Sequence, residues 1–429
     1  MKNKKGSRGT RNRMLRLSTM LSRFDMSVGN IARRHNVRAR YDNRVARYND
    51  ALANVTDKVL YARNREIPIN KLRVRFFLRR YECLSISKAV ARTMATQKVN
   101  DAEFVITTEK VFARCIDADL HWYAKLFKTC LGDCPAAFAG LTRLWLRNMR
   151  FDEPDILNTC KRLESLRLTC CDAGVRLVLQ VEHPQLVELA IDSGKFGTVV
   201  LNCLPKLQHL SYTNWSYQDP LCFESVPQLS KLSLAKMGIR STKNLEFSQF
   251  LADVPSITTL HLDFLSEKIW VLPEHPTLLA PVLGKLQIAK LVNLPEGCDI
   301  AWTMFILEAI VTDENFPREH GYCEKANVQW QPCTFDFKHK NLVQLTIYGF
   351  QPELNFVQYV RRVMEAAVNL REISLHDREV CGDCRDLDPK IKNKVCPSRY
   401  PRTCVEDMLR AEITRELGMA STALIHFRS

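Results

Sequence analysis

The stretch Leu141-Thr-Arg-Leu144-Trp-Leu146 sets the pattern of the chain, with apolar residues at its first, fourth and sixth positions. The same spacing occurs nine times, and the first positions are residues 141, 163, 186, 207, 229, 257, 283, 342 and 370. The first four intervals between copies are 22, 23, 21 and 22 residues, and the later ones are longer. Nine copies in one phase indicate a repeated structural unit rather than unrelated strands.

Each copy ends with two apolar residues that are two positions apart, so both lie on one face of a β-strand. A single strand of this kind cannot bury that face, but parallel stacking of neighbouring copies creates one continuous core. The repeat length of just over 20 residues is typical of leucine-rich repeats. The sequence therefore predicts an α/β fold, a right-handed leucine-rich-repeat solenoid with parallel strands on its concave face and helices or loops on its convex face.

The residues that flank each inward apolar pair are predicted to point to the concave face, which solenoid proteins use to hold protein partners. This face mixes both charge signs with aromatic and arginine side chains, the types that anchor protein interfaces. An alternative is that each of these flanking residues is an ordinary solvated strand residue. The candidate partner-binding residues are Arg143, Trp145, Arg147, Arg167, Glu188, His209, Lys231, His261, Lys285 and Tyr348.

The net charge of +15 is concentrated at the start of the chain, where residues 1–50 hold 14 Lys and Arg and only three Asp. We interpret residues 1–48 as a basic, disordered tail, with nuclear targeting or non-specific nucleic-acid contact as the functional alternative. The N-terminal cap and repeats are predicted over 49–335, and the last repeats with a C-terminal segment over 336–429. No apolar run is long enough for a membrane span, and no secretory signal is visible, so we expect a location in the nucleus or cytoplasm.

The elements predicted outside the repeats are mostly helical. Apolar residues at helical spacing predict helices over 48–62, 85–96, 301–311, 353–368 and 405–417, and alternation predicts strands over 69–76 and 103–107.

Motifs for phosphate, dinucleotide or zinc-hydrolase chemistry are missing, and no histidine is paired with a nucleophile, so we expect neither an enzyme nor a cofactor. Most of the 16 cysteines are interpreted as buried free thiols. Cys381, Cys384, Cys396 and Cys404 form a weak zinc candidate, because only the first two are close enough to act as a ligand pair. Incidental thiols are the favoured interpretation of these four.

The C-terminal part resembles plant F-box/LRR/FBD proteins, especially those of grasses. Two segments carry the likeness, Lys338-His-Lys-Asn341-Leu-Val-Gln-Leu345-Thr-Ile347-Tyr-Gly349-Phe350-Gln-Pro352-Glu353 and Val357-Gln-Tyr-Val360-Arg361-Arg362-Val-Met364-Glu365-Ala366-Ala-Val-Asn369-Leu370. Pro401-Arg-Thr403 and the stretch from Glu416 to Ser421 are also similar to that family's tail.

The resemblance implies a substrate receptor of an SCF-type ubiquitin ligase, which docks the cullin adaptor subunit through an F-box and presents a target protein on its repeats. The F-box is expected before residue 49, but the basic segment there does not show it. We therefore expect a non-catalytic, protein-binding repeat protein derived from such a receptor. The alternatives are a repeat scaffold without a ubiquitin link and a nucleic-acid-associated protein that uses its basic tail.

Overall fold

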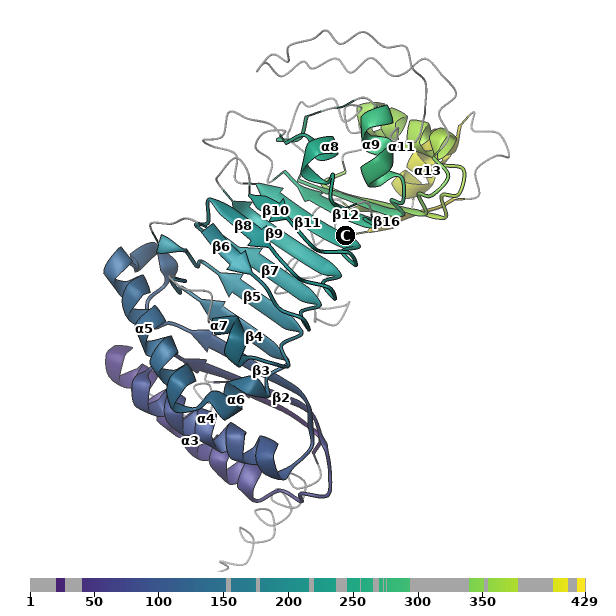
Figure 1. The fold of residues 1–429 in the computed structure, drawn as a ribbon. Coiled ribbons are helices and arrows are strands. Elements are labelled where there is room, and N and C mark those ends of the chain that lie inside the picture. Colours follow the sequence, from purple (N-terminus) through teal and green to yellow (C-terminus); the bar gives the residue numbers. More distant parts are fainter. Residues whose placement is uncertain are drawn as a thin grey trace, which may run out of the picture. The chain divides into compact units, whose positions relative to one another are not determined.

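The fold is a mixed α/β architecture with a large parallel sheet, here taken from a computed structural model (Figure 1). The structure describes residues 21–27, 41–151, 156–174, 178–215, 220–236, 245–254, 256–264, 270–272, 274, 276–293, 339–350, 354–376, 404–415 and 423–428. The chain divides into two compact units, unit 1 over Met1–Leu207 and unit 2 over Gln208–Ser429.

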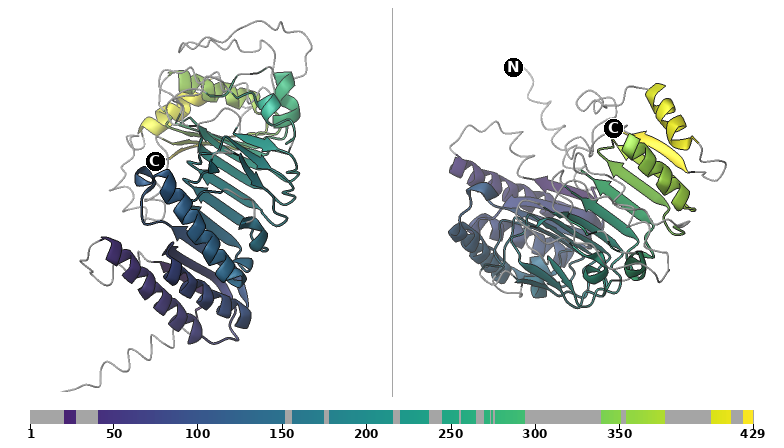
Figure 2. Two further views of the ribbon diagram at one scale, coloured as in Figure 1. Left: turned by 60° about the vertical axis from the view of Figure 1, so that its left-hand side comes forward. Right: turned by 90° about the horizontal axis from the view of Figure 1, so that it is seen from above.

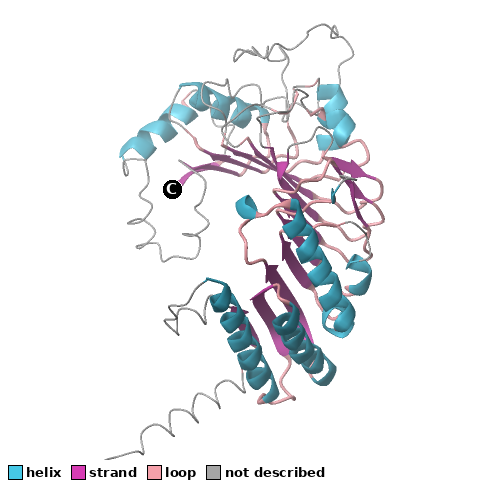
Figure 3. Ribbon diagram, turned by 90° about the vertical axis from the view of Figure 1, so that its left-hand side faces the viewer, coloured by secondary structure: helices cyan, strands magenta, loops and turns pink. Residues whose placement is uncertain are grey.

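Unit 1 begins with long strands and helices in alternation. Strand β1 (Arg23–Ser27) is followed by α3 (Tyr41–Tyr61), β2 (Ile69–Phe77), α4 (Arg80–Thr96) and β3 (Val99–Thr107). The helices α3 and α4 lie side by side, and helices and strands form adjoining layers (Figures 1 and 3). Alternate residues of β2 are buried, with Leu72, Val74 and Phe76 at 1% exposure or less. The strand therefore has one apolar face in the core and one polar face outside it.

The rest of unit 1 has shorter strands and helices. It comprises η1 (Phe112–Arg114), α5 (Asp117–Asp133), α6 (Pro135–Ala139), β4 (Arg143–Arg147), α7 (Ile156–Thr159), β5 (Ser165–Thr169), β6 (Val178–Val181), β7 (Glu188–Asp192) and β8 (Thr198–Leu201). The main sheet has the strand order β1-β2-β3-β4-β5-β7, and β6 pairs with β8 in a second sheet. All these pairings are parallel.

Unit 2, taken by itself, also has parallel strands, with longer connections between them. It comprises β9 (His209–Trp215), β10 (Leu221–Phe223), β11 (Lys231–Lys236), α8 (Phe247–Phe250), β12 (Thr259–Asp263), α9 (Pro276–Leu283), β13 (Ile288–Val292), β14 (Gln344–Tyr348), α11 (Leu354–Ala366), β15 (Glu372–His376), α13 (Cys404–Thr414) and β16 (Leu424–Arg428). Its main sheet runs β9-β11-β12-β13-β14-β15-β16, with parallel pairings. Helices α11 and α13 lie along one another close to β15 and β16 (Figure 2).

The apolar positions of the repeats pair with one another across the sheets. In unit 1, Leu144 lies opposite Leu166, and Leu166 lies opposite Leu189. In unit 2, Leu210, Leu232 and Leu260 form an equivalent row. All six side chains are at 3% exposure or less. Because each row buries the same kind of residue in every strand, a one-residue slip would turn the whole row to the other face.

Aromatic side chains fill the core beneath the strands. In unit 1, Phe76, Phe104, Phe138 and Phe127 form a chain of edge-to-face contacts with ring centroids 5.3, 5.6 and 5.7 Å apart. These contacts join β2 and β3 to α6 and α5. The helices therefore pack against the sheet through the preferred geometry of the aromatic pairs as well as through buried apolar area.

A residue with a left-handed backbone recurs at the end of many repeat strands, two positions after the third and last apolar residue of the repeat. Positive φ angles occur at Asn148, Cys170, Ser193, Asn214, Asn293 and Gly349. Asparagine and glycine tolerate this conformation better than other residues do. The recurrence at one phase shows that the turn is part of the repeated unit, a feature that the apolar pattern did not predict.

The seventh repeat has a different register from the one predicted. The sequence pattern placed its apolar positions at Leu283, Leu286 and Ile288, but β13 pairs Ala289 with Leu260 and Leu291 with Leu262. The correct set is therefore Leu286, Ala289 and Leu291. The prediction was wrong because Leu283 and Leu286 mimic the spacing, whereas Leu283 ends helix α9.

Several elements differ from the expectations for the ends of the repeats. Strand β1 and the first residues of α3 lie within residues 1–48, where a basic, disordered tail was expected. Phe24 and Met26 of β1 are buried and lie opposite Leu72 and Val74. Helix α5 and strand β16 were not predicted, whereas helices α3, α4, α11 and α13 were. The helix predicted over 301–311 lies outside the described residues.

Among the helices that the structure describes, none has the length and apolarity that crossing a membrane requires.

Candidate functional site

The polar face of the unit 1 sheet is the leading candidate site. Its middle row runs across the strands as Arg75, Val105, Trp145, Arg167 and Ala190. The row before it holds Arg73, Glu103, Arg143, Ser165 and Glu188. The buried leucines alternate with these residues along each strand, so the two rows lie on the opposite face of the sheet. We call this surface, with Arg147 at the end of β4, the open face of unit 1.

Trp145 is at the centre of the open face and is held in a fixed position. Its indole Nε1 donates a hydrogen bond to Oγ1 of Thr169 at 2.9 Å. The guanidinium of Arg167 lies over the indole ring, 4.9 Å from its centroid. Trp145 is half-buried, and Arg143, Arg147 and Arg167 are exposed. A rigid aromatic side chain beside arginines has the composition of a protein-interface anchor.

Ion pairs order the row before Trp145. Arg73 Nε lies 3.1 Å from Glu103 Oε1, and its Nη1 lies 3.8 Å from Asp25 Oδ2. Arg143 Nε lies 3.4 Å from Asp101 Oδ1. Farther along the row, Ser165 donates a hydrogen bond to Glu188 at 2.9 Å. These contacts fix side-chain positions on strands that are themselves fixed, so the face is pre-organised for binding.

The strands of unit 2 present a second polar face. Ser233, His261 and Lys290 lie opposite one another across β11, β12 and β13. Ser233 Oγ and His261 Nδ1 are 3.0 Å apart. Burial lowers the pKa of His261, nearby Lys290 lowers it further, and Asp263 opposes the change. His209 and Lys231 lie in the preceding row, as predicted from the repeat pattern.

The structure does not place Lys285 on this face. Lys285 is exposed in the turn between α9 and β13, Ile288 has the strand position that was assigned to it, and Lys290 follows two residues later on the same face. This correction follows from the register of the seventh repeat. Lys290 could have been found from the sequence if Asn293 had been recognised as the left-handed turn residue.

The last strands of unit 2 contain an aromatic and ionic cluster. Tyr348 stacks on His376 with ring centroids 4.3 Å apart and planes at 26°. In the next strands, Arg428 Nη2 donates a hydrogen bond to Glu372 Oε1 at 2.9 Å. Tyr348 was predicted as a candidate, but Arg428 was missed because β16 was not predicted.

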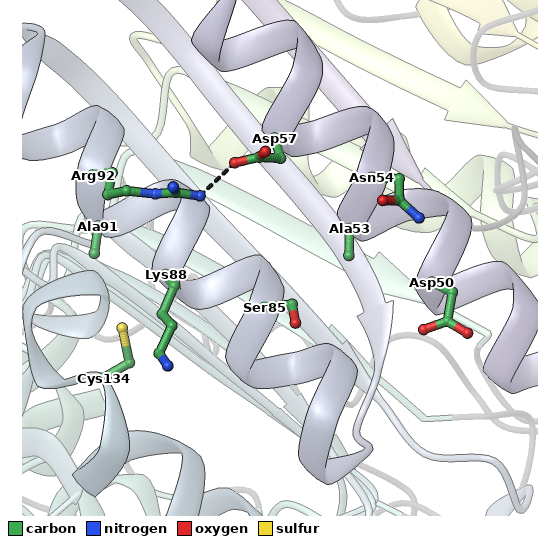
Figure 4. Close-up of a pocket in the computed structure, with 9 residues that line it drawn as sticks. All are labelled: Asp50, Ala53, Asn54, Asp57, Ser85, Lys88, Ala91, Arg92 and Cys134. Atoms are coloured by element: carbon green, nitrogen blue, oxygen red, sulfur yellow. Dashed lines mark hydrogen bonds and ion pairs between the residues drawn. The ribbon is translucent and has the colours of Figure 1, made fainter.

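A polar cleft lies between two helices of unit 1 (Figure 4). Its volume is about 610 Å³. Asp57 and Arg92 form an ion pair across it, and Lys88 and Cys134 lie at one end (Figure 4). Burial raises the pKa of the Cys134 thiol, which keeps it protonated and makes it a weak nucleophile. The lining holds no histidine that could act as its base.

The cysteines of the described residues are mostly core side chains. Cys83, Cys130, Cys160 and Cys171 are buried free thiols. Burial raises the pKa of Cys160 and of Cys171 to about 12. Within the described ranges, no three His, Cys, Asp or Glu residues are grouped as metal ligands. The zinc candidates Cys381, Cys384 and Cys396 lie outside those ranges, and Cys404 is the first residue of α13.

No protein-family model matches the chain, and no curated protein sequence matches it significantly.

Proposed function

We propose that the protein is a non-catalytic leucine-rich-repeat solenoid that binds a partner protein on its strand faces. The observation that carries the proposal is the pre-organised, half-buried Trp145 between Arg143, Arg147 and Arg167. Tryptophan and arginine are the residues most enriched among interface hot spots. A half-buried tryptophan fixed by a hydrogen bond and a cation–π contact loses little conformational freedom when a partner covers it.

The repeat assignment is supported by more than the apolar spacing. Leu163, Leu166, Leu168 and Cys171 fit the leucine-rich-repeat consensus, which has Asn or Cys at its ninth position. Cys171 is buried, and its thiol lies 3.4 Å from the carbonyl oxygen of Thr169 and 3.8 Å from that of Leu146 in the preceding strand. A small buried side chain that contacts the backbone of its own repeat and of the neighbouring repeat fits this position.

The partner class is proposed from the resemblance to F-box/LRR/FBD proteins. Their likeness lies in the region of β14, α11 and β15, and the protein is accordingly proposed to descend from the substrate receptor of an SCF-type ubiquitin ligase. In this role the target protein would bind the strand faces, and the cullin adaptor subunit would bind elsewhere on the chain.

A pull-down from cell extract at physiological salt tests target binding with a matched pair of variants. Trp145→Ala is expected to lower the retained partner at least about 10-fold, because a tryptophan anchor contributes more than about 2 kcal/mol. Trp122→Ala is the control, because Trp122 is 55% exposed on helix α5. Equal retention by both variants would contradict binding at the open face.

The same pull-down tests the ubiquitin link by probing for the adaptor subunit. Recovery of the adaptor supports the receptor role. Its absence, with a full-length F-box relative binding in parallel, reduces the function to that of a repeat scaffold. Neither result depends on Trp145, so the two parts of the proposal are tested separately.

A further inference from the structure

The charges of the open face of unit 1 are not balanced, and the imbalance defines the chemistry of its partner. The carboxylates of this face are already engaged by neighbouring side chains. Glu103 pairs with Arg73 at 3.1 Å and with Lys71 at 4.0 Å, and Asp101 accepts a hydrogen bond from Thr142 at 2.6 Å. Glu188 accepts from Ser165 at 2.9 Å. These acidic groups need no partner from another molecule.

Three arginines of the same face have no such compensation. Among the described residues, no carboxylate lies within ion-pair distance of Arg75, Arg147 or Arg167. Arg147 and Arg167 are exposed, and Arg75 is half-buried. A guanidinium binds a carboxylate through two parallel hydrogen bonds, so each arginine offers a directional site for an acidic group.

The arginines surround Trp145 at spacings that fit a peptide. Arg75 and Arg167 are three strands apart in one row, which corresponds to about 14 Å at a strand spacing of about 4.8 Å. An extended peptide rises about 3.3 Å per residue, so about four residues separate these two sites. An apolar or aromatic residue between two acidic ones would contact Trp145, and Arg147 lies two residues from Trp145 on the same strand.

A nucleic acid fits the same surface less well. A phosphate backbone requires a continuous positive surface, because every nucleotide carries a charge. On the open face, Glu103 lies in the row next to Val105 and Trp145, and Glu188 lies opposite Ser165 in that same row. These fixed carboxylates would repel a continuous polyanion but would accommodate the spaced charges of a peptide.

We propose that the open face of unit 1 binds an extended acidic segment of a partner protein, with its carboxylates on Arg75, Arg147 and Arg167 and an apolar residue against Trp145. This inference rests on the proposed function, since it specifies the partner of the same face.

The test is selection of a phage-displayed library of random peptides on the full chain at physiological salt. We expect the enriched peptides to contain Asp or Glu about four residues apart, with an apolar or aromatic residue between them. A fluorescein-labelled copy of the most enriched peptide is then titrated against the variants. Each single change of Arg75, Arg147 or Arg167 to Gln should weaken binding about 3- to 10-fold, and the triple change more than 10-fold.

The matched control is the triple variant Arg65→Gln, Arg80→Gln and Arg162→Gln. These exposed arginines lie after α3, at the start of α4 and before β5, and their loss removes the same total charge. Affinity unchanged by this control, with the thermal stability of both triple variants close to that of the wild type, assigns the effect to the open face.

Three results would overturn the inference. The first is enrichment without acidic bias, or no enrichment. The second is equal loss of binding in both triple variants, and the third is tighter binding of single-stranded oligo-dT than of the peptide. If Trp145→Ala still loses its partner in the pull-down, the proposed function survives these results. If Trp145→Ala retains the partner and the library shows no enrichment, both proposals fail.

Discussion

Arg150 and Asp172 form a two-pronged ion pair between adjacent repeats of unit 1. Arg150 Nε lies 2.7 Å from Asp172 Oδ1, and its Nη2 lies 3.0 Å from Asp172 Oδ2. The two residues also form an isolated parallel β-bridge, and Asp172 is buried. The pair therefore joins the turns that follow β4 and β5 at a place where water does not compete for the hydrogen bonds.

Asp172→Asn should lower the free energy of unfolding by about 2–4 kcal/mol, because it removes the buried counter-charge of a largely buried guanidinium and leaves only the exposed Asp117, whose Oδ1 lies 3.5 Å from Arg150 Nη2. Urea denaturation of the full chain measures the change. The control is Asp407→Asn, which breaks the exposed pair between Asp407 and Arg410 at 3.0 Å and should cost no more than about 1 kcal/mol. Equal effects of the two substitutions would show that the buried pair contributes no more to the free energy of unfolding than the exposed pair does.

Asn148 provides a test of the left-handed turn that ends the repeat strands. Its φ is 54°, and its Nδ2 donates hydrogen bonds to Thr108 Oγ1 at 2.6 Å and to the Lys110 carbonyl oxygen at 3.0 Å. Asn148→Ala loses both bonds and gains backbone strain, so we expect a loss of about 2–3 kcal/mol. Asn148→Gly loses the bonds without the strain.

The alanine variant should therefore be less stable than the glycine variant by about 1 kcal/mol. Thermal or urea unfolding of the two variants side by side gives this difference. The opposite order would mean that the turn relaxes to a negative φ at little cost. In that case the hydrogen bonds alone would explain the presence of Asn148.

The sequence predicted the repeat strands because their signal is redundant. Leu144, Leu166 and Leu189 must all face the core, so the apolar spacing follows directly from the need of each strand to bury one face. The same argument explains the failure at β13. Ala289 is a small residue that resembles a polar position in the pattern, whereas Leu286 and Ile288 imitate a strand pair. Only the backbone pairing of Ala289 with Leu260 separates the two registers.

The candidate site could be predicted only as a set of positions. The pattern placed Trp145, Arg167 and Arg143 on one face, but it carried no information on which charges neutralise one another. The roles of Thr169 and Asp101 depend on side-chain geometry between strands that are far apart in the chain. Arg75 lay in a predicted strand and was missed because that strand was treated as part of a cap.

Buried histidines make the stability depend on pH. His339 is fully buried, and burial lowers its pKa from 6.5 to about 4. Its Nδ1 accepts a hydrogen bond from the backbone N–H of Leu342 at 2.9 Å, which requires that nitrogen to be unprotonated. His183 is buried in a similar turn, accepts from the Gln185 N–H, and also has a pKa lowered by burial.

The neutral form of His339 is favoured in the folded state, so its contribution to stability is present above about pH 6.5. The contribution falls as the pH decreases from 6.5 to about 4, because the unfolded chain binds the proton first. Over that window we expect a loss on the order of 3 kcal/mol from this residue. Urea denaturation at several pH values should show the slope, and His339→Gln should make it shallower. An unchanged slope in this variant would assign the pH dependence to other groups.

The position of Lys290 can be tested through the titration of His261. Burial is the main cause of the lowered pKa of His261, and the positive charge of Lys290 in the adjacent strand adds to it. Lys290→Gln removes that charge and should raise the pKa of His261, as measured by NMR titration of its ring protons. Lys285→Gln is the matched control, because Lys285 lies in the turn outside the strand and should leave the titration unchanged.

Asp263→Asn should lower the pKa of His261, which is the opposite direction to Lys290→Gln, since Asp263 stabilises the protonated ring. If Lys285→Gln moved the pKa and Lys290→Gln did not, the pairings of Lys290 with His261 and of Ala289 with Leu260 would be wrong.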